Sequence, residues 1–185
     1  MPAKSQPSLA RAVKISLTLL GIMFLVMVAQ LACGPFLNRF GIVPRTSSGL
    51  VGVVFAPLLH ADLHHLLANA LPLLVLLTLL WSNREYRPGR TLALIWVASG
   101  LGTWVIGRGQ SIHLGASSIV FGLVAFLIMA GFRAKSWSSA FVAVLVFVLY
   151  GGVFYGVLPQ AGPISWEGHL CGAVAGVWAA SRLPA

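Results

Sequence analysis

The chain has 185 residues, of which 58% are apolar and only 8% are charged, and its mean hydropathy is +0.93. A soluble domain carries about 25% charged residues, so this composition excludes a soluble globular protein and indicates a single integral membrane domain. The net charge of +9 is spread over the loops in small groups, so we exclude nucleic acid as a partner and attribute the basic residues to membrane topology.

Apolar runs long enough to cross a bilayer follow a short polar leader over residues 1–13, and residues 14–185 are predicted to form one membrane domain. The segment 34–57 is too apolar for an aqueous loop and too broken by turn residues to span, so it should lie in the interface or against the bundle. The sequence therefore predicts an all-α, polytopic bundle of six transmembrane helices, at about 14–32, 62–81, 90–106, 115–132, 137–157 and 166–182.

The basic residues predict the orientation of this bundle. Nine of the twelve lie in the N-terminal segment, the second and fourth loops and the C-terminus, and three lie in the remaining loops. Because cytoplasmic segments carry the excess of Lys and Arg, both termini should be cytoplasmic. The second, fourth and sixth spans then begin on the non-cytoplasmic side.

Unusual polar residues occupy the first turns of these three spans. Ser117 opens the fourth span, His169 lies in the first turn of the sixth, and the second begins with His60, His64, His65 and Asn69. We expect these helix ends to meet, with Ser117 as a nucleophile and His169 as its base. Acidic residues do not suit a triad, because Glu85 is on the opposite side and Asp62 and Glu167 look like helix caps, so a dyad is the simpler prediction.

Neighbouring residues could stabilise an oxyanion and let the helices of the dyad approach each other. His65 and Asn69 are spaced i, i+4 on one helix face and could form an oxyanion hole with the backbone N–H of Ser117. Gly168, Gly172 and Gly176 make a small-residue stripe, which allows close approach of two membrane helices.

Each residue also has a purely structural explanation. Ser117 could bond only to its own helix, and Asn69 could make only an interhelical hydrogen bond. His60 and His64 could be solvated at the interface, and His113 is expected to be a loop residue.

Three segments in order, His60-Ala-Asp-Leu-His-His65-Leu-Leu-Ala-Asn69, Gly115-Ala-Ser117-Ser118 and Gly168-His169-Leu-Cys-Gly172-Ala-Val-Ala-Gly176, resemble the rhomboid intramembrane serine proteases. The resemblance extends over about residues 49–180 and implies the compact six-span bacterial form, in the bacterial inner membrane. It implies cleavage of transmembrane protein substrates near their outer ends, without a metal or cofactor.

By the same resemblance, Ser117 matches the nucleophile and His169 the base. His65 and Asn69 match the oxyanion-stabilising pair, His60 matches a histidine that precedes it, and Gly115 matches the glycine of the GxSG motif.

Two departures from the family pattern leave alternatives open. Ser118 stands where the family has glycine, and the first connector lacks the Trp-Arg pair of many members. One alternative is a catalytically weak relative that binds membrane proteins without cleaving them. Others are a metal site built from His60, His64, His65 and His169, which lacks the HExxH pattern of membrane metalloproteases, and a transporter, for which no charged residue lies at mid-bilayer depth.

Overall fold

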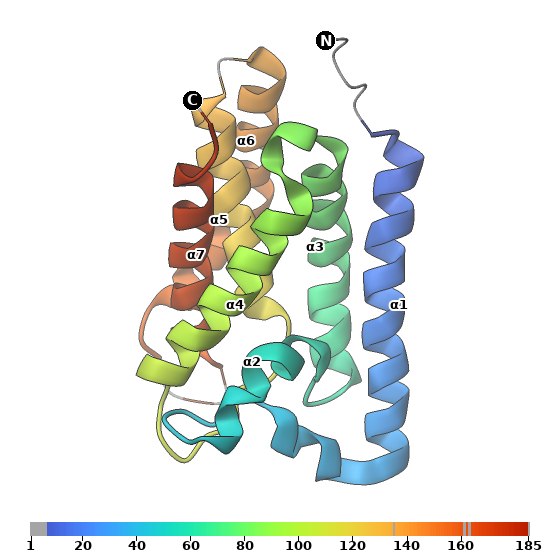
Figure 1. Cartoon of the computed structure of the whole chain (residues 1–185), viewed down its shortest axis with the longest axis vertical. Helices are drawn as coiled ribbons and strands as arrows, with labels where there is room; N and C mark the ends of the chain where they lie inside the picture. The colour runs from blue at the N-terminus through green and yellow to red at the C-terminus, as the bar shows by residue number, and fades with distance from the viewer. Residues whose placement is uncertain (1–6, 135, 161, 163, 185) are drawn as a thin grey trace.

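The computed structural model describes residues 7–134, 136–160, 162 and 164–184, and Lys4 and Lys135 of the charge count lie outside them. Within the described part, helices dominate, and an isolated bridge joins Ile42 to His113 (Figure 1). The predicted all-α membrane fold is confirmed. The α-helices are α1 (Leu9–Cys33), α2 (Gly52–Phe55), α3 (Leu63–Ser82), α4 (Pro88–Ile106), α5 (Ser117–Arg133), α6 (Trp137–Tyr150) and α7 (Trp166–Ser181). The 3-10 segments are η1 (Gly34–Phe40), η2 (Ser48–Leu50), η3 (Ala56–Leu58), η4 (Arg84–Tyr86) and η5 (Gly151–Val157).

Three helical segments of the described chain are long and apolar enough to cross a membrane: Leu9–Phe40, Leu63–Ser82 and Arg84–Ile106. Large apolar side chains on them face outward, such as Leu25 and Leu71, which are 72% and 68% exposed. The protein is therefore a multi-pass membrane protein. Helices α5, α6 and α7 have 17, 14 and 16 residues, so the count of six crossings stays a prediction.

Several helix boundaries differ from the predicted spans. Helix α1 begins at Leu9, inside the predicted leader, because the Ser8 hydroxyl accepts the N–H of Arg11 and caps it. The predicted fifth span ends as an α-helix at Tyr150 and continues as η5, which opens with two glycines of low helix propensity. Helix α5 begins at Ser117 itself, rather than two residues earlier. Asp62 and Ser165 cap α3 and α7 as predicted.

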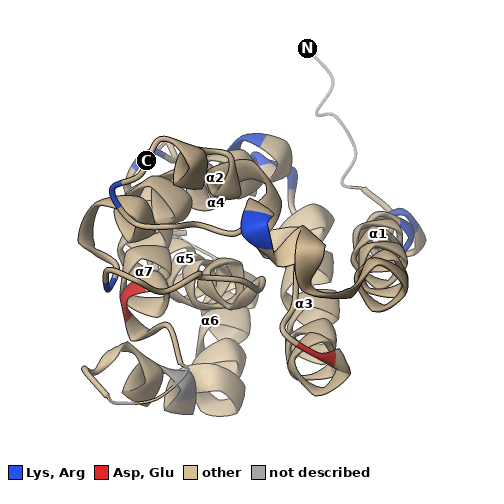
Figure 2. Cartoon of the chain, turned by 90° about the horizontal axis from the view of Figure 1, so that it is seen from below, with Lys and Arg blue, Asp and Glu red and all other residues tan. Residues whose placement is uncertain are grey.

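Helix α5 forms the centre of the bundle and packs against α3, α4, α6 and α7. Its side chains Leu123, Phe126 and Leu127 are fully buried. Figure 2 shows the bundle from the end at which α3, α5 and α7 begin, and few positions along the ribbon are charged residues. Because four helices pack against α5, its first turn, which begins at Ser117, has a fixed position.

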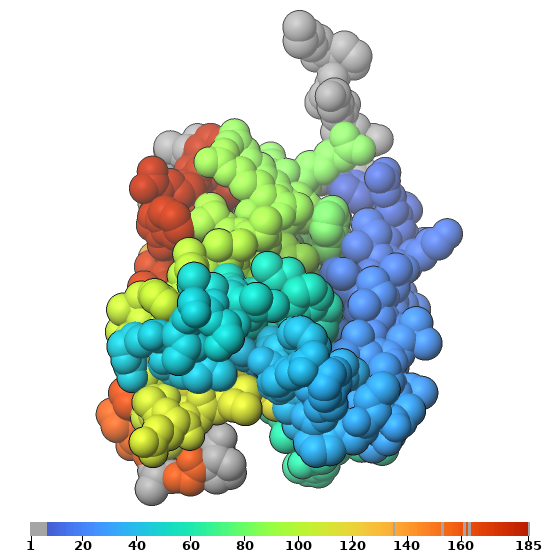
Figure 3. Space-filling view, turned by 60° about the horizontal axis from the view of Figure 1, so that its bottom comes forward, coloured from blue at the N-terminus to red at the C-terminus, as the bar shows by residue number. Residues whose placement is uncertain are grey.

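The segment between α1 and α3 folds against the same end of the bundle (Figure 3). The indole N–H of Trp96 donates to the carbonyl of Val53 at 3.1 Å, and that of Trp104 donates to the carbonyl of Thr46 at 2.8 Å. Arg45 donates to the carbonyls of Val105 and Gly107 at 2.9 and 2.8 Å. These bonds fix the connector on α4 and its following loop.

Candidate active site

The structure brings Ser117 and His169 into contact. Ser117 is the first residue of α5, His169 lies in the first turn of α7, and the Ser117 Oγ is 3.0 Å from the His169 Nε2. Gly172 permits this approach, because a Cβ there would overlap the carbonyl of Ser118. Gly176 lies in the same way against the carbonyl of Gly122. The glycine stripe thus lets the backbones of α5 and α7 touch.

Both ring nitrogens of His169 are engaged. The Nδ1 is 3.0 Å from the carbonyl oxygen of Gly156, and since a carbonyl only accepts, Nδ1 carries the proton. The Nε2 lone pair is then free to accept the Ser117 hydroxyl proton. Phe121 stacks on the imidazole, with ring centroids 4.0 Å apart and planes 11° apart. The ring is therefore fixed in tautomer and in plane.

Gly115 lies directly against His65. Its φ of +105° suits glycine alone, and a Cβ there would be 2.6 Å from the His65 Cε1. The N–H of Gly115 donates to the carbonyl of Ala56 at 2.9 Å. This places the imidazole of His65 beside the loop that enters α5, two residues before Ser117.

Asn69 lies one turn further along α3 than His65. It is 5% exposed, and its amide donates to the carbonyl of His65 at 2.9 Å. The Asn69 amide has a second N–H, and the backbone N–H of Ser117, at the first position of α5, has no acceptor within the helix. Asn69 and Ser117 therefore each retain one N–H donor.

His60 is buried, which excludes the alternative of a solvated interface residue, whereas His64 is exposed. The Nε2 of His60 accepts the N–H of Ala116 at 3.5 Å, and its ring meets that of His65 edge-on at 5.1 Å. Burial, followed by the charge of nearby His65, lowers the pKa of His60 from 6.5 to about 4. The imidazole is therefore neutral at physiological pH.

Gln30 of α1 holds the backbone of His60. The side-chain carbonyl accepts the His60 N–H at 3.1 Å, and the side-chain amide donates to the His60 carbonyl at 2.9 Å. Gln30 is itself buried. This pair of bonds ties the end of α1 to the entrance of α3.

Ser118, which replaces the family glycine, directs its hydroxyl toward α4. The Oγ is 3.5 Å from the Oγ of Ser99. Its carbonyl faces Gly172 at the α5–α7 contact.

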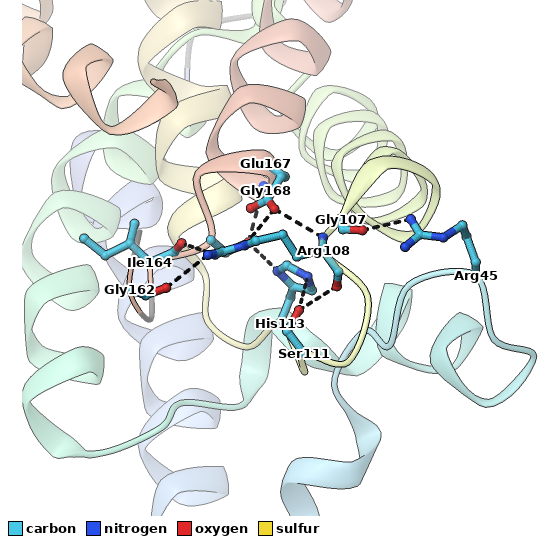
Figure 4. A network of polar contacts seen from close by, with 10 residues as sticks. Arg45, Gly107, Arg108, Ser111, His113, Gly162, Ile164, Glu167 and Gly168 are labelled. Atoms are coloured by element: carbon cyan, nitrogen blue, oxygen red, sulfur yellow. Dashed lines mark hydrogen bonds and ion pairs between the residues drawn. The ribbon is translucent and has the colours of Figure 1, made fainter. Parts of the chain in front are cut away.

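Arg108 joins the loop before α5 to the connector before α7 (Figure 4). Its Nε lies 2.8 Å from the carboxylate of Glu167, which is 1% exposed, and its guanidinium donates to the carbonyls of Gly162 and Ile164 at 3.1 and 2.5 Å. Glu167 was expected to be a helix-cap residue, and it is instead a buried ion-pair partner. The dyad-bearing helices are thus joined at their entrances.

His113 belongs to the same network; it lies in the loop between α4 and α5, as expected, and is buried there. Its Nδ1 is 2.6 Å from the Oγ of Ser165, and its Nε2 is 3.0 Å from the Oγ of Ser111. Burial lowers the pKa of His113, and the carboxylate of Glu167 opposes that shift.

Four contributors to the site were not predicted from the sequence: Gln30, Phe121, Gly156 and the Arg108–Glu167 pair. Phe121 follows Ser117 by four residues, so helical spacing could have identified it. The carbonyl of Gly156 leaves no sequence signal. Among the described residues, no group of three or more His, Cys, Asp or Glu side chains is arranged to hold a metal ion.

Comparison with known proteins adds a family context. A family profile described as "Rhomboid domain" matches residues 47–184. An uncharacterised protein of Mycobacterium tuberculosis is 46% identical over 178 residues, which cover 91% of this chain and 74% of that protein. A protein of Mycobacterium leprae is 38% identical over 178 residues, covering 91% and 70%. A protein of Acanthamoeba polyphaga mimivirus, named as a rhomboid protein, is 26% identical over 138 residues, covering 71% and 74%.

Proposed function

We propose that this chain, which belongs to the rhomboid family, is an intramembrane serine endopeptidase that uses Ser117 and His169 as a catalytic dyad. One observation carries the proposal: the Ser117 hydroxyl lies 3.0 Å from the Nε2 of His169, while the Nδ1 donates to a carbonyl. A serine that served only to cap or pack would not need a histidine held in this tautomer.

The reaction would follow the two steps of serine acyl transfer. Ser117 Oγ attacks the scissile carbonyl as His169 Nε2 takes its proton, and the imidazolium then returns the proton to the leaving amine as the C–N bond breaks. A water molecule, deprotonated by the same nitrogen, hydrolyses the acyl-enzyme and restores Ser117. The carbonyl of Gly156 holds the Nδ1–H through both steps, the position that a carboxylate takes in a triad.

The oxyanion formed in each step needs donors that are fixed in advance. We assign this role to the backbone N–H of Ser117 and the side chains of His65 and Asn69. The contact between His65 and Gly115 supports the assignment, because it keeps the imidazole beside the first turn of α5. His60 and Gly115 act as supports, and the Ser118 hydroxyl is turned toward Ser99.

The substrates would be transmembrane proteins, cut near their non-cytoplasmic ends, because the dyad lies only at the first turns of α5 and α7. We place the protein in the bacterial inner membrane with both termini cytoplasmic. The excess of basic residues at the opposite end of the helices supports this orientation.

The test is labelling of purified, detergent-solubilised protein with a fluorophosphonate, followed by mass spectrometry of the adduct. We expect an adduct on Ser117 that is lost in Ser117→Ala and His169→Ala while size-exclusion profiles and circular dichroism stay unchanged. Asn69→Ala should label about 10²–10³ times more slowly, the usual effect of one oxyanion donor. Ser138→Ala, at an exposed serine of α6, is the matched control.

Two results would contradict the proposal. Labelling that survives in Ser117→Ala would show a different nucleophile. Folded wild-type protein without an adduct would favour the non-catalytic binder, and Ser118→Gly would then show whether the departure from the family motif is the cause.

A further inference from the structure

An apolar groove of about 620 Å³ opens on the side of the bundle formed by α5, α6 and α7. Met129, Phe147, Val174 and Trp178 are among its lining residues. Phe147 and Val174 are 57% and 60% exposed, so the groove opens outward from the protein. In a membrane its occupant must be as apolar as an acyl chain.

Two helix faces that line the groove each lead to an arginine. On α5, Ala125 and Met129 line it, and Arg133 follows at the next four-residue step. On α7, Val174 and Trp178 line it, and Arg182 follows in the same way. Because residues four apart share a helix face, each apolar stripe leads into a guanidinium group.

Arg182 lies over the ring of Trp178, which lines the groove. Its guanidinium carbon lies 5.3 Å from the centroid of the Trp178 ring, so the charge is at the edge of the groove. Both Arg133 and Arg182 are exposed. Within the part of the chain that the structure describes, no carboxylate lies in an ion pair with either arginine.

The two arginines lie at the same end of the molecule. Helices α5 and α7 begin side by side at the dyad and have 17 and 16 residues, so they end at a similar height (Figure 1). Of the three acidic residues, Asp62 and Glu167 lie at the opposite end, and Glu85 lies in η4, between α3 and α4. The surface is therefore apolar along its length and positively charged at one tip.

We propose that this groove binds one anionic phospholipid, with its acyl chains along α5, α6 and α7 and its phosphate between Arg133 and Arg182. Guanidinium groups pair with phosphate through two parallel hydrogen bonds, and basic pockets between transmembrane helices are suited to anionic headgroups. An apolar helix from a second copy would fill the groove but would leave both guanidinium groups without an anion. The charge at the tip thus favours the lipid.

The experiment is native mass spectrometry of the full-length protein in detergent, titrated with dioleoylphosphatidylglycerol or with dioleoylphosphatidylcholine. We expect one tightly bound phosphatidylglycerol and weaker binding of phosphatidylcholine. Each basic residue near a headgroup contributes about fivefold in affinity, so Arg133→Gln with Arg182→Gln should weaken phosphatidylglycerol binding about 25-fold. Ala173→Phe, which fills the groove but keeps both arginines, should weaken binding of both lipids.

Arg90→Gln is the matched control, since Arg90 is exposed at the start of α4, at the same end of the molecule. It should bind phosphatidylglycerol as the wild type does. Equal binding by the double variant, or an equal loss in Arg90→Gln, would overturn the site. A dimer mass that disappears in Ala173→Phe would identify a second copy as the occupant instead.

Discussion

His169 is held at Nδ1 by a backbone carbonyl, at Nε2 by the Ser117 hydroxyl and on its face by Phe121. A carbonyl fixes the tautomer as a carboxylate would, but it brings no negative charge to stabilise an imidazolium. Because a carbonyl is the partner of Nδ1, no anion has to be desolvated against the His169 ring. The proposed dyad can therefore work at a helix entrance without a carboxylate beside its base.

Acidification should destabilise the protein through His60. Its pKa is about 4 in the folded state and 6.5 ordinarily, so between these values the unfolded chain binds more protons. Stability is thus complete above pH 6.5 and falls as the pH drops toward 4, by about 3 kcal/mol at most. The free energy of unfolding in detergent, followed by circular dichroism between pH 7.5 and 4.5, measures this.

The variant His60→Gln should have a flatter pH profile, although the lowered pKa of His113 adds a loss in the same direction. His64→Gln, at an exposed position, should keep the wild-type profile. A wild-type free energy of unfolding that is constant over this range would refute the role of buried, neutral His60.

Single residues were predictable from the sequence where their type is costly in a membrane. Ser117, His169, His65 and Asn69 were selected because polar groups at span entrances need partners. The backbone bonds of His60 to Gln30 could not be predicted, because Gln30 is 30 residues away in the chain. Backbone acceptors such as Gly156 have no side chain from which a role could be inferred.

Helices α5 and α7 are in contact along a backbone surface that only glycine permits. Gly172→Ala should therefore push the helices apart, lengthen the Ser117–His169 bond and destabilise the fold by about 1–3 kcal/mol, as overpacking does. Fluorophosphonate labelling and the free energy of unfolding both report on the change.

Gly21→Ala in α1 is the control, because a Cβ there meets nothing within 4 Å. Alanine is the better helix former, so this variant should be as stable as the wild type or slightly more stable. Gly172→Ala with unchanged labelling and stability would mean that the contact between α5 and α7 is looser than the structure indicates.

Most helices could be located from hydropathy, and the caps at Asp62 and Ser165 from their residue types. The change from α6 to η5 was missed, since the run up to residue 157 is uniformly apolar and hydropathy does not distinguish α from 3-10 geometry. The Arg108–Glu167 pair was missed because it joins the loop before α5 to the first turn of α7, and spacing along one element cannot reveal it.

The complete molecule has a polar site at one end of the helices and most of its basic residues at the other. Helix α1 ends at the site, because Gln30 in its last turn bonds to His60. Cys33 at that end is a free, exposed thiol, and Cys171 is the other free cysteine. In a Cys171→Ala variant, Cys33 is the single thiol. Its labelling then reports how the protein is oriented in the membrane.

If the termini are cytoplasmic, a membrane-impermeant maleimide added to intact bacterial spheroplasts should label Cys33, because the reagent reaches only the outer face. A second variant, Cys33→Ala with Cys171→Ala and Pro184→Cys, places the thiol at an exposed position near the C-terminus and should react only after lysis. Mass spectrometry of the purified protein gives the labelled fraction for each. The reverse pattern would put the dyad on the cytoplasmic side and reject the inference from the charge bias. Labelling of both thiols before lysis, with a cytoplasmic marker protein unlabelled, would mean that both chain positions face outward and that the number of crossings between them is even, not odd.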